Sequence, residues 1–293
     1  MNSPFPKNIT FKKELKINDQ EFKQLRDFIY EKSGIYIGDN RKYLLENRLG
    51  NRLKAHNLKS FGEYFYFLRY DAQRNEELTK LFEVITTNET SFFRNPPQIK
   101  VFQEQILRDL VKTKKAKGDK RIHVWSAGCS TGEEPYTLSI VLHEAMNYEM
   151  SSWKIKISAH DLSNAVLSAA KRGIYSHYAL RSTPPEIVKK YFLEESPGMF
   201  RVQDKVKELV HFGQINLSDR FQLKKVERSD VIFCRNVIIY FDEDMKKNVI
   251  NSFYDNLLPG GYMFIGHSES LHNISRAFKP MHYPGSIVYL KEK

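Results

Sequence analysis

The chain has 293 residues, with 46 lysines and arginines against 35 aspartates and glutamates, and so a formal net charge of +11. Its composition, 41% hydrophobic and 28% charged, is typical of a globular protein, and no apolar run approaches the roughly 20 residues of a membrane span. Two cysteines, Cys129 and Cys234, provide no disulfide framework and no metal-ligand set, and residues 1–13 hold no apolar signal segment. We therefore expect a cytoplasmic protein with no metal and with an acidic partner.

The first part of the chain predicts a small helical domain. Apolar side chains recur at helical spacing in four segments, which we expect to be helices: 19–34, 41–53, 61–68 and 78–85. Asp19 is the predicted N-cap of the first helix. In the second, Leu45, Leu49 and Leu53 form one stripe. Because strand alternation is absent here, residues 15–87 are predicted to form an all-helical N-terminal domain that docks the partner.

Basic side chains concentrate on the second predicted helix. Residues 41–59 hold six lysines or arginines against one acid, Glu46. Arg41, Arg48 and Arg52 lie beside the leucine stripe and are our candidates for docking an acidic partner. The alternative is a solvated helix face with no partner.

Residues 88–120 are predicted to join this domain to the rest of the chain through a linker or lid and a connecting helix. The segment before Pro96 is rich in small polar residues and forms helix poorly. It is either a plain linker or a lid that brings Asn88, Thr90 and Arg94 over a ligand. The lysine-rich stretch 112–120 is predicted to be a solvated loop.

From residue 121 to 293, strand-like and helix-like segments alternate, which predicts a mostly parallel sheet with helices on both faces. The pattern is interrupted by a turn at Pro197-Gly198, where we expect a short antiparallel β insertion over about 193–212. The fold class is therefore α/β and Rossmann-like. The expected strands are 122–127, 155–161, 231–234, 262–266 and 286–290, and the expected helices are 163–172, 186–192 and 243–258.

The segment from Arg121 to Tyr136 says most about the ligand. A buried strand is followed by a turn with Gly128 and Gly132 and then by a helix, the arrangement that places an adenosine-type ligand at the carboxyl edge of a sheet. The turn lacks the glycine spacing of a pyrophosphate cradle, and Glu133 and Glu134 would repel phosphates. Carboxylates suit S-adenosylmethionine, which has ribose hydroxyls, an ammonium and a sulfonium.

Polar residues also follow two other predicted strands. Asp161 ends the second strand, where a carboxylate can accept hydrogen bonds from ribose hydroxyls, or can merely cap the next helix. Arg235 and Asn236 follow the strand that ends at Cys234, at the substrate edge of such a sheet. The ring of Tyr240 could line a methyl-transfer site, where an aromatic face attracts a sulfonium, or could pack in the core.

Four motifs, in this order, resemble those of the CheR-type chemotaxis receptor methyltransferases. The resemblance extends from about residue 15 to the C-terminus and implies a helical N-terminal domain and an S-adenosylmethionine-binding domain. It implies an S-adenosylmethionine-dependent protein-glutamate O-methyltransferase that esterifies glutamates on the cytoplasmic helices of chemoreceptors and releases S-adenosylhomocysteine. The motifs are Thr87-Asn88-x-Thr90-x-Phe92-Phe93-Arg94, Ser130-Thr131-Gly132-Glu133-Glu134-Pro135-Tyr136, Phe233-Cys234-Arg235-Asn236-x-x-Ile239-Tyr240-Phe241 and Gly266-His267-Ser268-Glu269-Ser270.

The resemblance also implies the site residues. Arg94 and Tyr240 match positions near the transferred methyl group and are the catalytic candidates. Whether Glu133 or Glu134 contacts the ammonium stays open. A glutamate acceptor, with a pKa of about 4.3, is ionised at neutral pH and needs no general base, so in-line positioning and desolvation suffice. The implied cofactor contacts are Asn88, Thr90, Arg94, Glu134, Asp161, Asn216, Leu217, Arg235 and Asn236.

The expected partners are receptor cytoplasmic helices, with no stable nucleic acid binding, no membrane insertion and a monomeric state. The stretch from Leu193 to Phe200 is shorter than the excursion with which some family members bind a receptor C-terminal peptide, so we expect weak or no such tethering. Two alternatives are considered. The net charge permits methyl transfer to nucleic acid, although no Asn-Pro-Pro-aromatic motif follows the fourth strand, and a non-catalytic receptor-docking module is the other.

Overall fold

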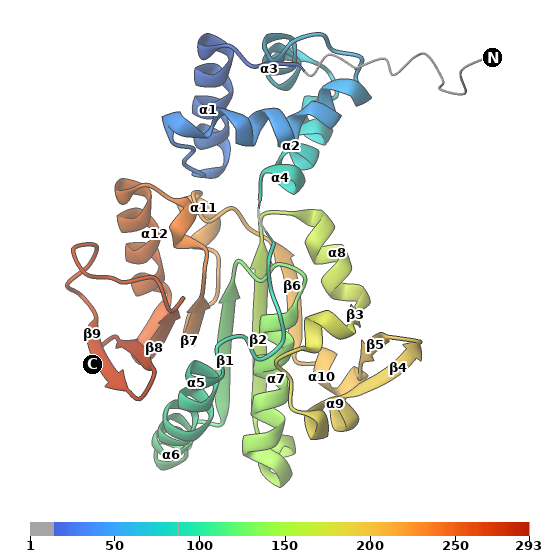
Figure 1. The fold of residues 1–293 in the computed structure, drawn as a ribbon. Helices are drawn as coiled ribbons and strands as arrows, with labels where there is room; N and C mark the ends of the chain where they lie inside the picture. Colours follow the sequence, from blue (N-terminus) through green and yellow to red (C-terminus); the bar gives the residue numbers. More distant parts are fainter. Residues whose placement is uncertain (1–14, 87, 293) are drawn as a thin grey trace. The chain divides into compact units, whose positions relative to one another are not determined.

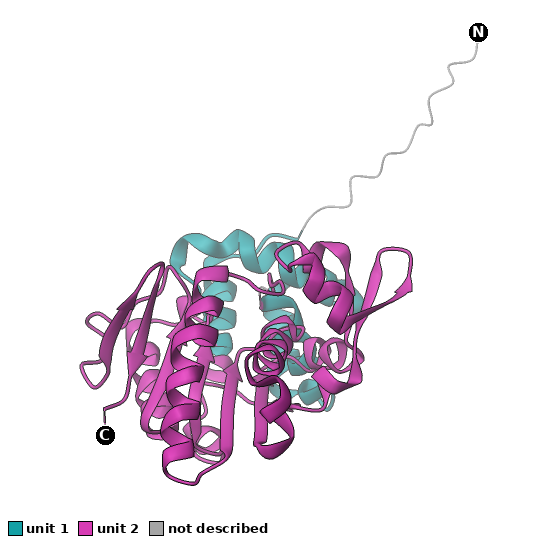
Figure 2. Ribbon diagram, turned by 90° about the horizontal axis from the view of Figure 1, so that it is seen from below, with its two compact units in different colours: residues 1–29, 37–85 teal, residues 30–36, 86–293 magenta. Residues whose placement is uncertain are grey.

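The structure is a computed structural model that describes residues 15–86 and 88–292. The chain divides into two compact units, which Figure 2 colours separately. The helical unit lies within residues 1–29 and 37–85, and the α/β unit lies within residues 30–36 and 86–293. Thr87, the first residue of the first motif and the predicted domain boundary, lies outside the described residues. No helix in the described part of the chain has the length and apolar character needed to cross a membrane.

The helices predicted in the first part of the chain are confirmed. They are α1 (Asp19–Ser33), α2 (Lys42–Ala55), α3 (Phe61–Tyr70) and α4 (Arg74–Ile85), with a 3-10 turn, η1 (Asp39–Arg41), before α2. The predicted stripe of Leu45, Leu49 and Leu53 is fully buried.

The predicted cap of α1 is wrong by one residue. The side chain of Asn18 accepts from the Glu21 amide at 2.9 Å, and the Glu21 carboxylate accepts from the Asn18 amide at 3.0 Å. This reciprocal pair is a capping box, so Asn18 is the N-cap and Asp19 is the first helical residue.

The α/β unit is built on a seven-stranded sheet in the order β6-β2-β1-β7-β8-β10-β9. The first five strands are mutually parallel, and β10 runs antiparallel to both of its neighbours. The strand order reverses between β1 and β7, so ligands are expected at the carboxyl ends of these two strands. The strands are β1 (Arg121–Ala127), β2 (Lys154–Asp161), β6 (Val210–Gln214), β7 (Ser229–Cys234), β8 (Leu257–Ile265), β9 (Lys279–Tyr283) and β10 (Ser286–Leu290).

Both faces of the sheet are covered, which explains the near-continuous apolar strands. Val124 and Phe233 belong to one buried cluster, and the alternate residues Trp125 and Ile232 belong to another. The first cluster includes residues of α5 (Pro96–Val101), the π-helical turn η2 (Phe102–Ile106), α6 (Leu107–Ala116) and α7 (Glu133–Met146). The second includes residues of α11 (Arg220–Leu223) and α12 (Glu243–Asn256).

The remaining elements surround a small antiparallel sheet, β3-β5-β4, at the right of Figure 1. They are η3 (Asn147–Ser152), α8 (Asn164–Arg172), β3 (Ile174–Ser176), η4 (His177–Leu180), α9 (Pro185–Tyr191), β4 (Phe192–Ser196), β5 (Met199–Val202), α10 (Asp204–Lys207) and η5 (Ile238–Tyr240).

The insertion differs from the predicted span of about 193–212. Its sheet also takes a strand from Ile174–Ser176, whereas Val210–Gln214 pairs in parallel with β2 in the large sheet. The edge strand β9 was also not predicted. Both large-sheet strands are short edge strands with exposed residues, so they lack the apolar run that marks the central strands.

The predicted loop at 112–120 is also corrected, because α6 continues to Ala116. Lys114 is buried, and its Nζ lies 2.8 Å from a carboxylate oxygen of Asp230 and 3.5 Å from one of Asp119. The lysine stem packs along the helix while its charge is paired. A lysine-rich composition therefore concealed a partly buried helix.

Candidate active site

The loops that follow β1 and β7 pack closely against each other at the switch point. Gly128 has a φ of +79°, and a Cβ at this position would lie 2.4 Å from a side-chain methyl group of Val237. Gly132 has a φ of +96° and precedes α7. The two glycines therefore permit both the left-handed turn and the contact between loops.

Asp161, at the end of β2, binds the loop after β1. One carboxylate oxygen accepts from the Ser130 amide at 2.8 Å, and the other accepts from the Ser163 amide at 3.0 Å. A carboxylate has about four lone-pair positions, so two remain for ligand hydroxyls. Ser130 has a φ of +48°, and its Oγ is buried with no hydrogen-bond partner among the described residues.

The two glutamates of the first turn of α7 have different partners. Glu134 accepts from the Ser126 hydroxyl at 2.7 Å through Oε1, and its Oε2 lies 3.3 Å from Nη1 of Arg235. Glu133 accepts from the Thr131 hydroxyl at 2.7 Å. Glu134 is thus oriented toward the loop after β7, while Glu133 is bound within its own turn.

Arg235 has a side chain that is only 4% exposed, and protein groups occupy its guanidinium. Besides Glu134, Nε donates to the Gln98 side chain at 2.9 Å, and Nη2 donates to the Arg94 carbonyl at 2.6 Å. The predicted direct contact of Arg235 with a cofactor is therefore replaced by an indirect role, which is to hold Glu134 and the Arg94 backbone. Gln98, which also donates to the Ile265 carbonyl at 2.8 Å, had no sequence signal.

The predicted lid is anchored at Phe92, which is fully buried and makes edge-on contacts with Tyr175 and Phe192. The next amide, that of Phe93, donates to the Thr137 hydroxyl on α7 at 3.0 Å. These contacts carry Arg94 to the first turn of α7.

Of the three predicted lid residues, Arg94 alone lines the cavity described below, within the described part of the chain. Its Nη1 donates to the Glu89 carbonyl at 2.9 Å. Asn88 is exposed, and its side-chain amide donates to the Thr86 hydroxyl at 3.3 Å. Thr90 is partly exposed.

A cavity of about 330 Å³ lies where the loops after β7 and β8 meet the Arg94 segment. Its described lining residues are Arg94, Asn95, Arg235, Asn236, His267 and Ser268. Two guanidinium groups make it suitable for an anion. His267 and Ser268 come from the fourth motif, which carried no assigned role in the sequence.

Three other predicted residues lie around this edge of the sheet. Tyr240 is partly exposed in η5, and its carbonyl accepts from the Tyr36 amide at 2.8 Å. The Asn216 side chain accepts from the Ser218 amide and hydroxyl and donates to a backbone carbonyl, so it organises its own turn. Leu217 is 9% exposed and packs in the second apolar cluster.

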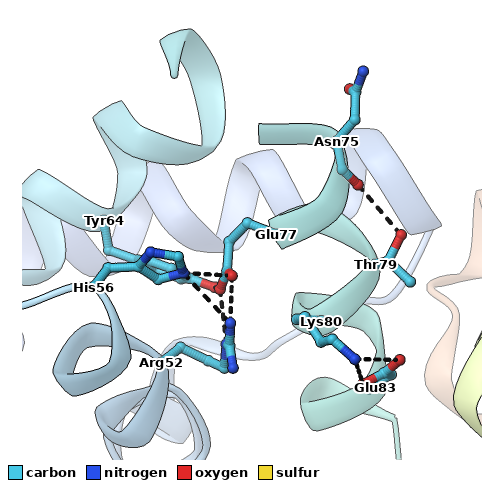
Figure 3. A network of polar contacts seen from close by, with 8 residues as sticks. All are labelled: Arg52, His56, Tyr64, Asn75, Glu77, Thr79, Lys80 and Glu83. Atoms are coloured by element: carbon cyan, nitrogen blue, oxygen red, sulfur yellow. Dashed lines mark hydrogen bonds and ion pairs between the residues drawn. The ribbon is translucent and has the colours of Figure 1, made fainter. Parts of the chain in front are cut away.

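Two of the three predicted docking arginines instead bind groups of the helical unit. Arg48 donates to the carbonyl of Ile85. Arg52 donates through Nε to Glu77 at 2.8 Å, and Glu77 is 2% exposed (Figure 3). Arg41 is exposed, so it alone of the three keeps the exposure that docking needs.

Burial raises the pKa of each of the three carboxylates at the cofactor edge. For Glu134 the opposing influences are Arg235 and the Ser126 hydroxyl, and for Glu133 the Thr131 hydroxyl. For Asp161 the opposing influences are the backbone amides that it accepts. Buried carboxylates with incomplete compensation favour a cationic ligand.

Comparison with known proteins decides the family. Residues 20–86 match the family described as "CheR methyltransferase, all-alpha domain", and residues 88–287 match "CheR methyltransferase, SAM binding domain". The chain belongs to the CheR methyltransferase family. As a CheR methyltransferase it is an enzyme that uses S-adenosylmethionine.

Curated CheR relatives align over most of the chain. Chemotaxis protein methyltransferase 2 of Vibrio cholerae is 36% identical over 278 residues, 95% of each chain. A chemotaxis protein methyltransferase of Borreliella burgdorferi is 37% identical over 262 residues, 89% of this chain and 92% of the relative. That of Salmonella typhimurium is 34% identical over 282 residues, 95% of this chain and 92% of the relative.

The CheR cofactor suits the residues at this edge of the sheet. Ser130 offers an unpartnered hydroxyl, Asp161 has free lone pairs for ribose hydroxyls, and the glutamates complement an ammonium. Gly128 and Gly132 leave room for close approach of a ligand to the backbone. Within residues 15–86 and 88–292, no group of three or more His, Cys, Asp or Glu side chains could hold a metal ion.

The raised pKa values predict how cofactor affinity depends on pH. Binding an ammonium requires ionised carboxylates, so affinity for S-adenosylhomocysteine should be highest above the raised pKa values and fall as pH decreases through them. The decline should begin at a higher pH than ordinary Asp and Glu would give. Calorimetric titration between pH 8 and pH 5 checks this, and Glu134→Gln should bind more weakly with a flatter profile. A wild-type affinity that stays constant over this range would contradict the prediction.

Proposed function

We propose that the chain methylates glutamate side chains on the cytoplasmic helices of chemotaxis receptors, forming methyl esters with S-adenosylmethionine as the donor. The observation that carries the proposal is the position of the Arg94 cavity beside the acid-lined cofactor edge, linked by the Arg235–Glu134 ion pair. A cationic cavity suits an anionic acceptor, and the adjacent carboxylates suit a cationic donor.

For cofactor binding we propose Asp161 as the acceptor of ribose hydroxyl hydrogen bonds. Glu134 is the proposed partner of the ammonium, because its oxygens are oriented toward the loop after β7, whereas Glu133 is bound to Thr131. Arg235 fixes this carboxylate. Asn88, Thr90, Asn216, Leu217 and Asn236 stay proposed contacts, with Leu217 providing apolar surface.

When bound, S-adenosylmethionine supplies a methyl group activated by its sulfonium. The acceptor glutamate is already ionised at neutral pH, so no residue has to remove a proton. The task of the chain is then to hold the carboxylate in line and to exclude water. We assign the first task to the Arg94 guanidinium and the placement of the methyl group to Tyr240.

The proposed organisation follows from this assignment. Residues 15–87 form the receptor-docking domain with Arg41 as its docking candidate, residues 88–120 connect, and residues 121–293 form the catalytic domain. Because the methylated receptor helices are cytoplasmic, the enzyme would act there. A monomeric state, the absence of stable nucleic acid binding and weak or no binding of a receptor C-terminal peptide stay predictions.

The test is transfer of labelled methyl from S-adenosylmethionine to purified receptor cytoplasmic fragments, with RNA and DNA as parallel acceptors. We expect label on receptor fragments that mild alkali releases as methanol, as a methyl ester requires, and none on nucleic acid. A fragment whose methylated glutamates are replaced by alanine is the acceptor control. Alkali-stable label, or label on nucleic acid alone, would contradict the proposal, and no label on any acceptor would indicate a non-catalytic module.

A further inference from the structure

Glu269, in the fourth motif, accepts hydrogen bonds from backbone amides of two different loops. Its Oε2 accepts from the amides of Gly266 and Asn236, the latter at 2.8 Å, and its Oε1 accepts from the amide of Ile239 at 3.2 Å. Gly266 follows β8, and Asn236 and Ile239 follow β7. One carboxylate therefore joins the two loops that line the Arg94 cavity.

The contact leaves little space, which indicates a built arrangement. A Cβ at position 266 would lie 2.6 Å from a Glu269 carboxylate oxygen and 2.9 Å from the Asn236 amide nitrogen. Asn236 has a φ of +61°, a left-handed conformation that is uncommon outside glycine. Hydrogen bonds from backbone amides to an ionised acceptor are stronger than neutral ones, so the carboxylate can hold this strained backbone.

The bound turn also leads to Tyr240. The Tyr240 amide donates to the Val237 carbonyl at 3.1 Å, so the 3-10 turn begins inside the segment held by Glu269. Fixing Asn236 and Ile239 therefore fixes the start and middle of the turn that presents Tyr240. Glu269 itself does not line the Arg94 cavity.

We propose that Glu269 is a positioning residue for methyl transfer, which holds Asn236 and the Tyr240 turn in register with the loop after β8. The inference rests on the proposed function, because the register matters for aligning an acceptor carboxylate with the methyl group. A misplacement of about 1 Å can cost about 10²-fold in rate. The expected effect of losing the carboxylate is of this size.

The experiment compares Glu269→Gln and Glu269→Ala with the wild-type chain. Glutamine keeps the shape, but its NH₂ group would face a backbone donor, so one set of bonds is lost. Calorimetry with S-adenosylhomocysteine gives the number of competent sites, and receptor methylation gives turnover for each site. Glu292→Gln, which removes an exposed carboxylate paired with Lys279, is the matched control.

We expect Glu269→Gln to retain full binding stoichiometry and an affinity within about tenfold of wild type, while turnover for each site falls by about 10²-fold. Glu269→Ala should lose at least as much, and Glu292→Gln should match wild type. A purely structural role would reduce the number of competent sites and leave their turnover intact, which would overturn the proposal. So would turnover for each site within twofold of wild type in Glu269→Gln.

Amide NMR separates this inference from the proposed function. The signals of Asn236, Ile239 and Gly266 should move upfield and exchange faster in both Glu269 variants. If the wild-type chain methylates no receptor fragment, the proposed substrate is wrong, and these three amides alone decide whether Glu269 holds the loops. Unchanged amide signals would overturn the inference whatever the acceptor is.

Discussion

Arg52→Ala is expected to destabilise the helical unit by about 3 kcal/mol, because it removes one partner of a buried ion pair. Glu77 would keep its hydrogen bonds from the Tyr64 hydroxyl, at 2.6 Å, and from His56 Nε2, at 2.7 Å. It would lose both bonds from Arg52 (Figure 3). A carboxylate that is 2% exposed would then lack its strongest cationic partner.

The pKa of Glu77 supports the sign of this effect. Burial alone would raise that pKa, but the hydrogen bonds from Arg52, Tyr64 and His56 bring it below its usual range. The network therefore contributes stability fully above the ordinary glutamate pKa, and this contribution is lost as pH falls through the lowered value. Arg52→Ala should accordingly be less sensitive to acid than the wild-type chain.

Hydrogen exchange of α2 to α4 in the full-length chain measures the loss, and Lys80→Ala is the control. Lys80 forms an ion pair with Glu83 in the same unit but is 45% exposed, so its removal should cost less than about 1 kcal/mol. Arg41→Ala should leave protection unchanged and reduce receptor methylation. If Arg52→Ala keeps wild-type protection and loses receptor methylation, Arg52 is a docking residue after all.

The contrast between Arg41 and Arg52 explains where sequence reasoning reached its limit. Composition located the basic segment and helical spacing located the leucine stripe, because both depend on residues close together in the chain. The partner of Arg52 is Glu77 on α4, 25 positions away, and nothing in the spacing of one helix indicates it. A charge pattern therefore predicts the sign of a surface but not which charges are already paired.

The site shows the same division. The strand, glycine turn and helix around Gly128 could be predicted because the turn conformation requires glycine and the strand is apolar. Arg235 was correctly expected at the carboxyl edge, but its bonds to Gln98 and Glu134 come from three separate segments. The amides bound by Glu269 carry no side-chain signature at all. Contacts to backbone groups across loops are what a single sequence conceals.

Arg94→Ala is expected to reduce receptor methylation by about 10²-fold while leaving affinity for S-adenosylhomocysteine nearly unchanged. The side chain lines the cavity, whereas the Arg94 carbonyl, not its side chain, accepts from Arg235. That backbone bond survives the substitution, so the Arg235–Glu134 pair at the cofactor edge is preserved. What is lost is the guanidinium that would orient the acceptor carboxylate.

Single-turnover methylation and calorimetry on the same preparation separate these effects, and Arg94→Lys adds a graded comparison. Lysine keeps the charge without the planar fork, so it should recover only part of the rate. Arg121→Ala is the matched control, because Arg121 is exposed, pairs locally with Asp119 and begins β1 at the opposite end of the sheet. Equal losses of cofactor affinity and of rate would instead make Arg94 a cofactor ligand. Its guanidinium would then act on the bound donor, and another group would have to orient the acceptor.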